Sequence, residues 1–243
     1  MRSFLLLSLF LCAALSAQTI TSPNKSMSLT VSMSADSVPH YTLSLGTTPV
    51  VAPSRLGIAV KDIPSFLSGF TVVKAETSLV NESWNPVLGE VKTIRNHYRE
   101  LKLTLRQPSV KDRIMLLTFR LFDDGVGFRY EFPQQDNLNY FTVAGERTEF
   151  ALTGDHKVFW MPGDFDTNEY KYAETNLSGV DAAAHKDRGE IFTAGITSNS
   201  MVQTPIQMKS KDGLYINIAE AALVNYPAMC LEVDTKQFLL SSV

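Results

Sequence analysis

Cysteine is nearly absent from this sequence, and this scarcity limits how the protein can be stabilised. Only Cys12 and Cys230 occur among the 243 residues, and Cys12 lies inside an apolar run at the N-terminus. Once that run is removed, Cys230 has no partner in its own chain, which excludes an intramolecular disulfide. A hydrophobic core must therefore stabilise the fold, and the 44% of hydrophobic residues can supply one at this chain length.

The sequence also has no excess of basic residues. Lys and Arg number 22 against 25 Asp and Glu, which gives a formal net charge of −3 at pH 7. Affinity for a phosphate backbone depends on clustered Lys and Arg, which this charge balance does not favour. We therefore expect no nucleic-acid partner.

Long apolar runs are missing except at the N-terminus. Residues 4–15 are almost entirely apolar, follow Met-Arg-Ser and end at the small residues Ser16 and Ala17. This run is shorter than the ~20 residues that a membrane-spanning helix needs, and it has the layout of a secretory signal. The sequence predicts a signal peptide over residues 1–17, no membrane span, and an exported protein in the periplasm or otherwise secreted.

Self-contained catalytic motifs are lacking as well. The chain has no Gly-x-Ser-x-Gly elbow, no His-Glu-x-x-His helix and no phosphate-binding Gly-x-x-x-x-Gly-Lys loop. Gly125 and Gly127 are not followed by the third spaced glycine of a dinucleotide-binding turn. The four histidines, His40, His97, His156 and His185, show no metal-ligand spacing. These local patterns yield no catalytic residue.

Strand patterns are abundant. Period-two alternation predicts strands over residues 27–33, 41–45 and 101–106. Further strands are predicted over residues 70–74, 114–122, 127–132, 140–143, 158–161 and 213–218. Helical character is confined to residues 178–188 and 220–223. We predict a single all-β domain, an antiparallel meander folded into a β-sandwich.

Turn residues separate these strands. Asp123, Asp124 and Gly125 are predicted to supply the positive φ of a tight hairpin, and Asp212-Gly213 marks another turn. Residues 238–243 have the composition of an apolar strand. We therefore expect the domain to be truncated at its C-terminal end, with an unpaired strand there that favours aggregation.

The segment from Asp164 to Glu169 places oxygen-bearing side chains at alternate positions, as a calcium-binding EF loop does. It departs from that loop at position six, where Glu169 replaces glycine, and at position twelve, where Thr175 replaces glutamate. The residues alone favour a turn in which Asp side chains cap nearby backbone amides. The residues leave open whether this segment contributes a single carboxylate ligand to a calcium ion.

Four segments carry a family resemblance. They are ESWNPVLGE (82–90) with KTIRNHY (92–98), FDDGVGFRYEFP (122–133), TGDH (153–156) with WMPGDFDTNEY (160–170), and DGLYIN (212–217) with EAALVNY (220–226). In this order they resemble the N-terminal domain of glycoside hydrolase family 97, whose members cleave α-linked glucose or galactose from oligosaccharides.

This resemblance implies a large β-sandwich of the supersandwich, galactose-mutarotase-like kind over residues 18–243. In the family it precedes a (β/α)8 barrel that carries the catalytic carboxylates. The expected partners are therefore that barrel and an α-linked oligosaccharide, and no catalytic residue is expected here. The sandwich lends one carboxylate to a calcium ion, and Glu169 matches that ligand. One carboxylate cannot bind calcium tightly, because the ion takes six to eight oxygens. The glutamate at position 169 resembles the calcium-dependent α-glucosidase branch of the family.

Other readings of the chain are a free-standing carbohydrate-binding module and an inactive scaffold that meets partners through a sheet edge. Four aromatic residues, Trp84, Trp160, Tyr170 and Tyr172, have the chemistry to stack on a sugar. We expect Trp84 to pack in the core and the two tyrosines to face the barrel. The substrate-binding residues stay unknown.

Overall fold

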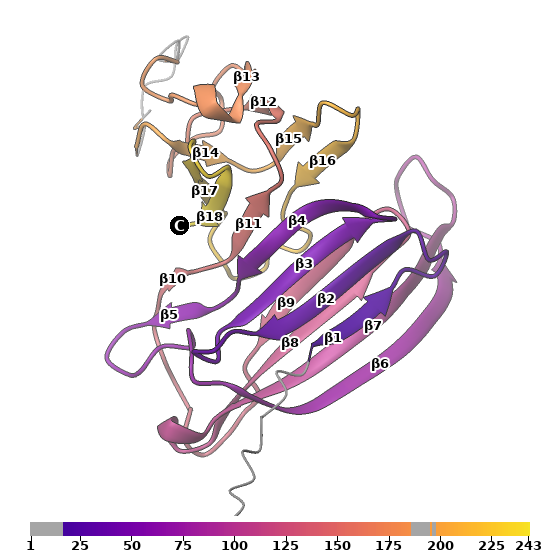
Figure 1. Ribbon diagram of the computed structural model, residues 1–243, viewed down its shortest axis with the longest axis vertical. Coiled ribbons are helices and arrows are strands. Elements are labelled where there is room, and N and C mark those ends of the chain that lie inside the picture. The colour runs from indigo at the N-terminus through magenta and orange to yellow at the C-terminus, as the bar shows by residue number, and fades with distance from the viewer. Residues whose placement is uncertain (1–16, 186–194, 196–197) are drawn as a thin grey trace, which may run out of the picture.

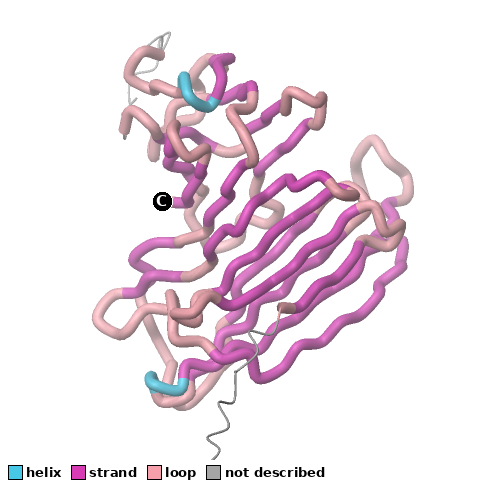
Figure 2. The backbone as a smooth tube through the Cα atoms, viewed as in Figure 1, coloured by secondary structure: helices cyan, strands magenta, loops and turns pink. Residues whose placement is uncertain are grey.

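The computed structural model describes residues 17–185, 195 and 198–243. Strands dominate this part of the chain, and its helical elements are two short 3-10 turns, η1 (Pro108–Val110) and η2 (Leu177–Gly179) (Figure 2). The predicted all-β class is confirmed. The predicted signal peptide falls, apart from Ala17, outside the described residues and stays a prediction.

One layer of the fold is an antiparallel sheet of eight strands in the order β1-β2-β3-β4-β11-β18-β17-β14 (Figure 1). Its members are β1 (Gln18–Thr21), β2 (Met27–Met33), β3 (Pro39–Leu45), β4 (Thr48–Arg55), β11 (Glu149–Leu152), β14 (Met201–Gln203), β17 (Cys230–Asp234) and β18 (Leu239–Ser242). The first half of this sheet comes from the N-terminal strands, and the second half from strands far along the chain.

The opposite layer contains two four-stranded sheets, β6-β7-β8-β9 and β13-β12-β15-β16. They comprise β6 (Thr71–Trp84), β7 (Ile94–Gln107), β8 (Arg113–Leu121), β9 (Val126–Glu131), β12 (Lys157–Trp160), β13 (Ala173–Asn176), β15 (Ile206–Lys209) and β16 (Tyr215–Ile218). A separate pair joins β5 (Ile58–Val60) to β10 (Val143–Glu146). The predicted β-sandwich is confirmed.

Two hydrophobic clusters fill the space between the layers. The first includes Leu29 and Tyr41 from the large sheet and Leu103 and Phe119 from β7 and β8. The second gathers buried residues of β11, β12, β15, β17 and β18. Phe150 and Ile216 pack against both clusters. The interior is therefore continuous from one end of the sandwich to the other.

Alternation along the sequence accounts for the strands that form the first cluster. In β2, Met27, Leu29 and Val31 are buried while the intervening polar residues are half-exposed, and its bounds agree with the predicted ones. Strands β8 and β9 form the predicted hairpin, in which the Phe122 N–H donates to the Gly125 carbonyl at 2.8 Å. The predicted positive φ was wrong, because none of residues 123–125 adopts it. A four-residue loop of this kind suits turns with negative φ.

The expectation of an unpaired strand at the C-terminal end was wrong. β18 lies inside the large sheet, paired with β11 on one side and β17 on the other. Leu240 is fully buried in the second cluster. Of the apolar residues in 238–243, Leu240 is the one buried between the two layers, and Phe238 packs partly buried against the same cluster.

Three smaller expectations also differ from the structure. Residues 140–143 were predicted as a strand, but the strand here is β10, which begins at Val143, where β5 provides a partner. Residues 220–223 are irregular. Of the predicted helical stretch 178–188, the described part holds the end of η2 and turns. In the described part of the chain, no helix has the length and apolarity to cross a bilayer.

Candidate functional site

The loop of residues 161–172, which connects β12 to β13, contains the predicted metal ligand. We call it the Asp164 loop. Its first residues run beside β14, where the Gly163 N–H donates to the Met201 carbonyl at 2.7 Å and the Gln203 N–H donates to the Met161 carbonyl at 3.1 Å. A Cβ on Gly163 would lie 2.4 Å from the Met201 Cγ, so this close approach requires glycine.

The buried carboxylate of Asp164 organises the loop. Its Oδ1 accepts the Asp166 N–H at 2.8 Å, and its Oδ2 accepts the Tyr170 hydroxyl at 2.7 Å and the Gly195 N–H at 2.6 Å. Burial raises the pKa of Asp164, but these donors outweigh it and hold the pKa below its ordinary value. The predicted capping by an Asp side chain is thus present at Asp164.

A second set of contacts supports the middle of the loop. The Gln203 side-chain amide donates to the Thr167 carbonyl at 2.7 Å. The Glu169 N–H in turn donates to the Thr167 Oγ1 at 3.2 Å. Gln203 of β14 therefore holds the backbone of Glu169 in place through Thr167, while the Glu169 side chain is exposed.

No three His, Cys, Asp or Glu side chains in the described part of the chain converge on a point that could hold a metal ion. Glu169 and Asp166 are both exposed, whereas Asp164 is occupied by its own donors. As a carboxylate, Glu169 is a hard oxygen ligand of the kind calcium prefers. One carboxylate supplies only a small part of the six to eight oxygens that calcium takes, so the described residues do not form a calcium site by themselves.

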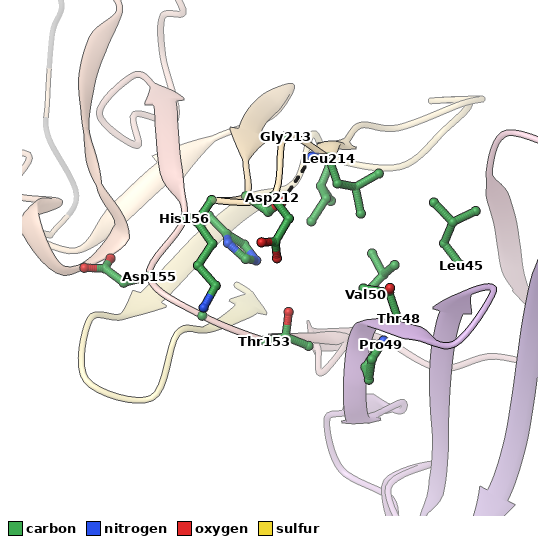
Figure 3. A pocket seen from close by; sticks show the side chains of 14 residues that line it. Leu45, Thr48, Pro49, Val50, Thr153, Asp155, His156, Asp212, Gly213 and Leu214 are labelled. Atoms are coloured by element: carbon green, nitrogen blue, oxygen red, sulfur yellow. Dashed lines mark hydrogen bonds between the residues drawn. The ribbon is translucent and has the colours of Figure 1, made fainter.

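A hollow of about 650 Å³ lies between the two layers, beyond the end of β11. In Figure 3, Leu45, Thr48 and Val50 of the β3–β4 hairpin lie on one side, and His156 and Asp212 lie on the other. His156 is only 6% exposed, and its Nε2 is buried without a hydrogen-bond partner. Burial lowers the pKa of His156, and the nearby Asp155 carboxylate opposes this shift.

The buried imidazole predicts that acid destabilises the protein. As the pH falls through ~6.5, the ordinary pKa of histidine, the unfolded chain takes up a proton that folded His156 does not yet bind. The free energy of unfolding should therefore fall between pH 7.5 and 5.5. Urea titrations at both pH values measure this fall, and His156→Phe should make it smaller. An equal fall in the variant would assign the effect to other groups.

Comparison with known proteins identifies the fold. The family model described as "Glycosyl-hydrolase 97 N-terminal" matches residues 20–241. The chain belongs to glycoside hydrolase family 97. It corresponds to the N-terminal domain of that family, as the sequence resemblance predicted.

Solved family 97 enzymes have a closely similar domain. An enzyme from Pseudoalteromonas sp. strain K8, solved with acarbose, matches at 29% identity with a TM-score of 0.80, covering 93% of this chain and 31% of the other. A variant of that enzyme, solved with panose, gives the same values. A beta-arabinopyranosidase shares the fold at 17% identity and a TM-score of 0.75, with 93% and 35% covered. This chain thus spans about a third of the length of each of these solved chains.

The long β6–β7 hairpin ends in an apolar tip. Val87 is 98% and Leu88 88% exposed, and Trp84 and Val91 beside them are also exposed. The tip projects at the right of Figure 1. The expectation that Trp84 packs in the core was wrong, because β6 is an edge strand whose side chains are largely exposed.

The other aromatic candidates have different surroundings. Trp160 is fully buried, donates its Nε1–H to Thr175 Oγ1 at 3.0 Å and stacks on His185 with centroids 4.9 Å apart. Tyr170 is buried against Asp164, whereas Tyr172 is exposed. In this family 97 domain Trp160 and Tyr170 are interior residues, so the expectation that Tyr170 faces the barrel was wrong. No local sequence pattern indicated that Gln203 supports this loop.

Proposed function

We propose that this chain is the non-catalytic N-terminal domain of an exported, calcium-dependent α-glycosidase of the α-glucosidase type. In this proposal the domain packs on a catalytic (β/α)8 barrel and donates the Glu169 carboxylate to a calcium ion at the active site. The observation that carries the proposal is an exposed carboxylate on a loop fixed by buried hydrogen bonds, in a family 97 domain. Acarbose and panose, bound by the Pseudoalteromonas enzyme, support an α-linked oligosaccharide as substrate.

Glu169 acts in this proposal as one ligand among several. Calcium takes six to eight oxygen ligands, so the catalytic barrel must supply most of the shell. A bound divalent ion orients a hydrolytic site and stabilises developing charge. The role of this domain is to hold one negative oxygen ligand at a fixed place on its surface.

The apolar hairpin tip supports packing against a larger neighbour. Contiguous apolar side chains on a soluble protein usually mark an interaction surface, and Val87 and Leu88 are almost fully exposed. The share of the solved enzymes that this chain spans, 31 to 35%, is consistent with such a neighbour.

The proposal predicts that catalysis needs both domains. This chain alone should not hydrolyse maltose or p-nitrophenyl α-glucoside above a buffer blank, because glycoside cleavage needs a pair of carboxyl groups across the bond. The whole enzyme, meaning this domain together with its catalytic barrel, should hydrolyse them and should be found in the periplasmic or secreted fraction. Calcium chelation should lower that activity.

Two results would overturn the proposal. Turnover by the repurified chain alone would show that it carries its own active site. Binding of maltooligosaccharides by this chain, with no effect of the chain on the barrel, would favour a free-standing carbohydrate-binding module.

A further inference from the structure

We propose that Asp164, Tyr170 and Gln203 are positioning residues that preorganise the backbone around Glu169 for calcium binding. This inference rests on the proposed function, because it takes Glu169 as the ligand. None of the three touches the ion in this proposal; each acts through the Asp164 loop.

The Asp164 carboxylate binds the loop on both sides of Glu169. Its Oδ1 holds the Asp166 N–H at 2.8 Å, three residues before Glu169, and its Oδ2 holds the hydroxyl of Tyr170, the next residue, at 2.7 Å. The Gly195 N–H, at 2.6 Å from the same Oδ2, joins a distant part of the chain to this point. Both oxygens of a buried carboxylate are thus used to close the loop.

Gln203 fixes the loop from the other side. Its amide reaches the Thr167 carbonyl at 2.7 Å, and the hydroxyl of the same Thr167 accepts the Glu169 N–H at 3.2 Å. A chain of contacts therefore runs from β14 through Thr167 to the backbone of Glu169. Gln203 is itself buried, so its side chain has little freedom to leave this position.

The physical reason for such support is entropic. A carboxylate on a mobile loop loses conformational freedom when it binds a metal, and this loss weakens the affinity. A loop that is already ordered avoids this loss, which is why groups that orient metal ligands change affinity without touching the metal.

The test compares matched variants of the whole enzyme. Tyr170→Phe removes one hydroxyl from a buried ring, and Gln203→Met removes the amide at similar volume. Each should weaken calcium affinity about tenfold, the low end of effects for groups that orient ligands. Tyr140→Phe makes the same chemical change at an exposed tyrosine outside this loop and should leave affinity unchanged. Calcium affinity is measured by chelator competition.

A second measurement does not depend on calcium or activity. In this chain alone, amide hydrogen exchange at Asp166 and Glu169 should be slow, and Tyr170→Phe or Gln203→Met should accelerate it. Fast exchange of both amides in the wild type would overturn the proposal, whether or not a variant folds poorly.

The outcomes separate this inference from the proposed function. If Glu169→Gln leaves calcium affinity unchanged, Glu169 is not a ligand and the proposed calcium role fails. If Glu169→Gln weakens binding while Tyr170→Phe and Gln203→Met bind as the wild type does, only the positioning role fails. Excess calcium should restore the maximal rate of both positioning variants, because their active sites are otherwise intact.

Discussion

Replacing Glu169 with glutamine in the whole enzyme is expected to weaken calcium binding by at least the roughly 10- to 100-fold that loss of a group orienting a ligand costs, and to lower activity at limiting calcium. The substitution keeps the side-chain volume and one carbonyl oxygen but removes a negative charge, and calcium affinity depends on the charge of its ligands. Because Glu169 is exposed, the free energy of unfolding should change by no more than about 0.5 kcal/mol. Activity measured against calcium concentration gives the shift.

Asp166→Asn is the matched control for this prediction. It removes the same charge from an exposed carboxylate of the same loop, three residues away. A general electrostatic effect would weaken calcium binding similarly in both variants, whereas ligation by Glu169 alone gives a much larger shift for Glu169→Gln. Identical calcium curves for the wild type and Glu169→Gln would leave Glu169 as a surface residue of a turn.

The sequence predicted the strands whose alternation is strong and whose partners are close in the chain. β2 and the predicted part of β3, residues 41–45, follow a clear period of two, and the two strands pair with each other in a hairpin. It missed β5, a three-residue strand that pairs with the distant β10, and β14, which pairs with β17. Such short strands exist because tertiary contacts supply their partners, and local propensity carries little signal for them.

The site was predictable in part. The Asp-rich segment indicates capping, which is present at Asp164, and the family resemblance singles out Glu169. The hydrogen bond from the Gln203 amide to the Thr167 carbonyl joins residues 36 positions apart, and no local sequence pattern predicts a contact at that separation. The prediction that Trp84 packs in the core was wrong because tryptophan favours a core position in general. The location of β6 at a sheet edge depends on the whole topology, which the local sequence does not reveal.

The position of the last strand leads to a second large expected effect. Leu240 is fully buried and lies opposite Phe150 of β11 and Val233 of β17. Leu240→Ala should lower the free energy of unfolding by about 2–5 kcal/mol, because it removes buried methyl groups and leaves a cavity. The midpoint of urea unfolding of this chain measures the loss.

Leu239→Ala provides the comparison within the same strand. Leu239 points to the other face of the sheet and is half-buried, so truncating it should cost about 1 kcal/mol from the smaller apolar area removed from water. A large difference between adjacent leucines indicates an ordered strand with one buried face, since side chains in a loose segment contribute alike. If both variants unfold at the wild-type urea concentration, β18 does not form a central strand, and the initial expectation of an unpaired terminal strand is restored.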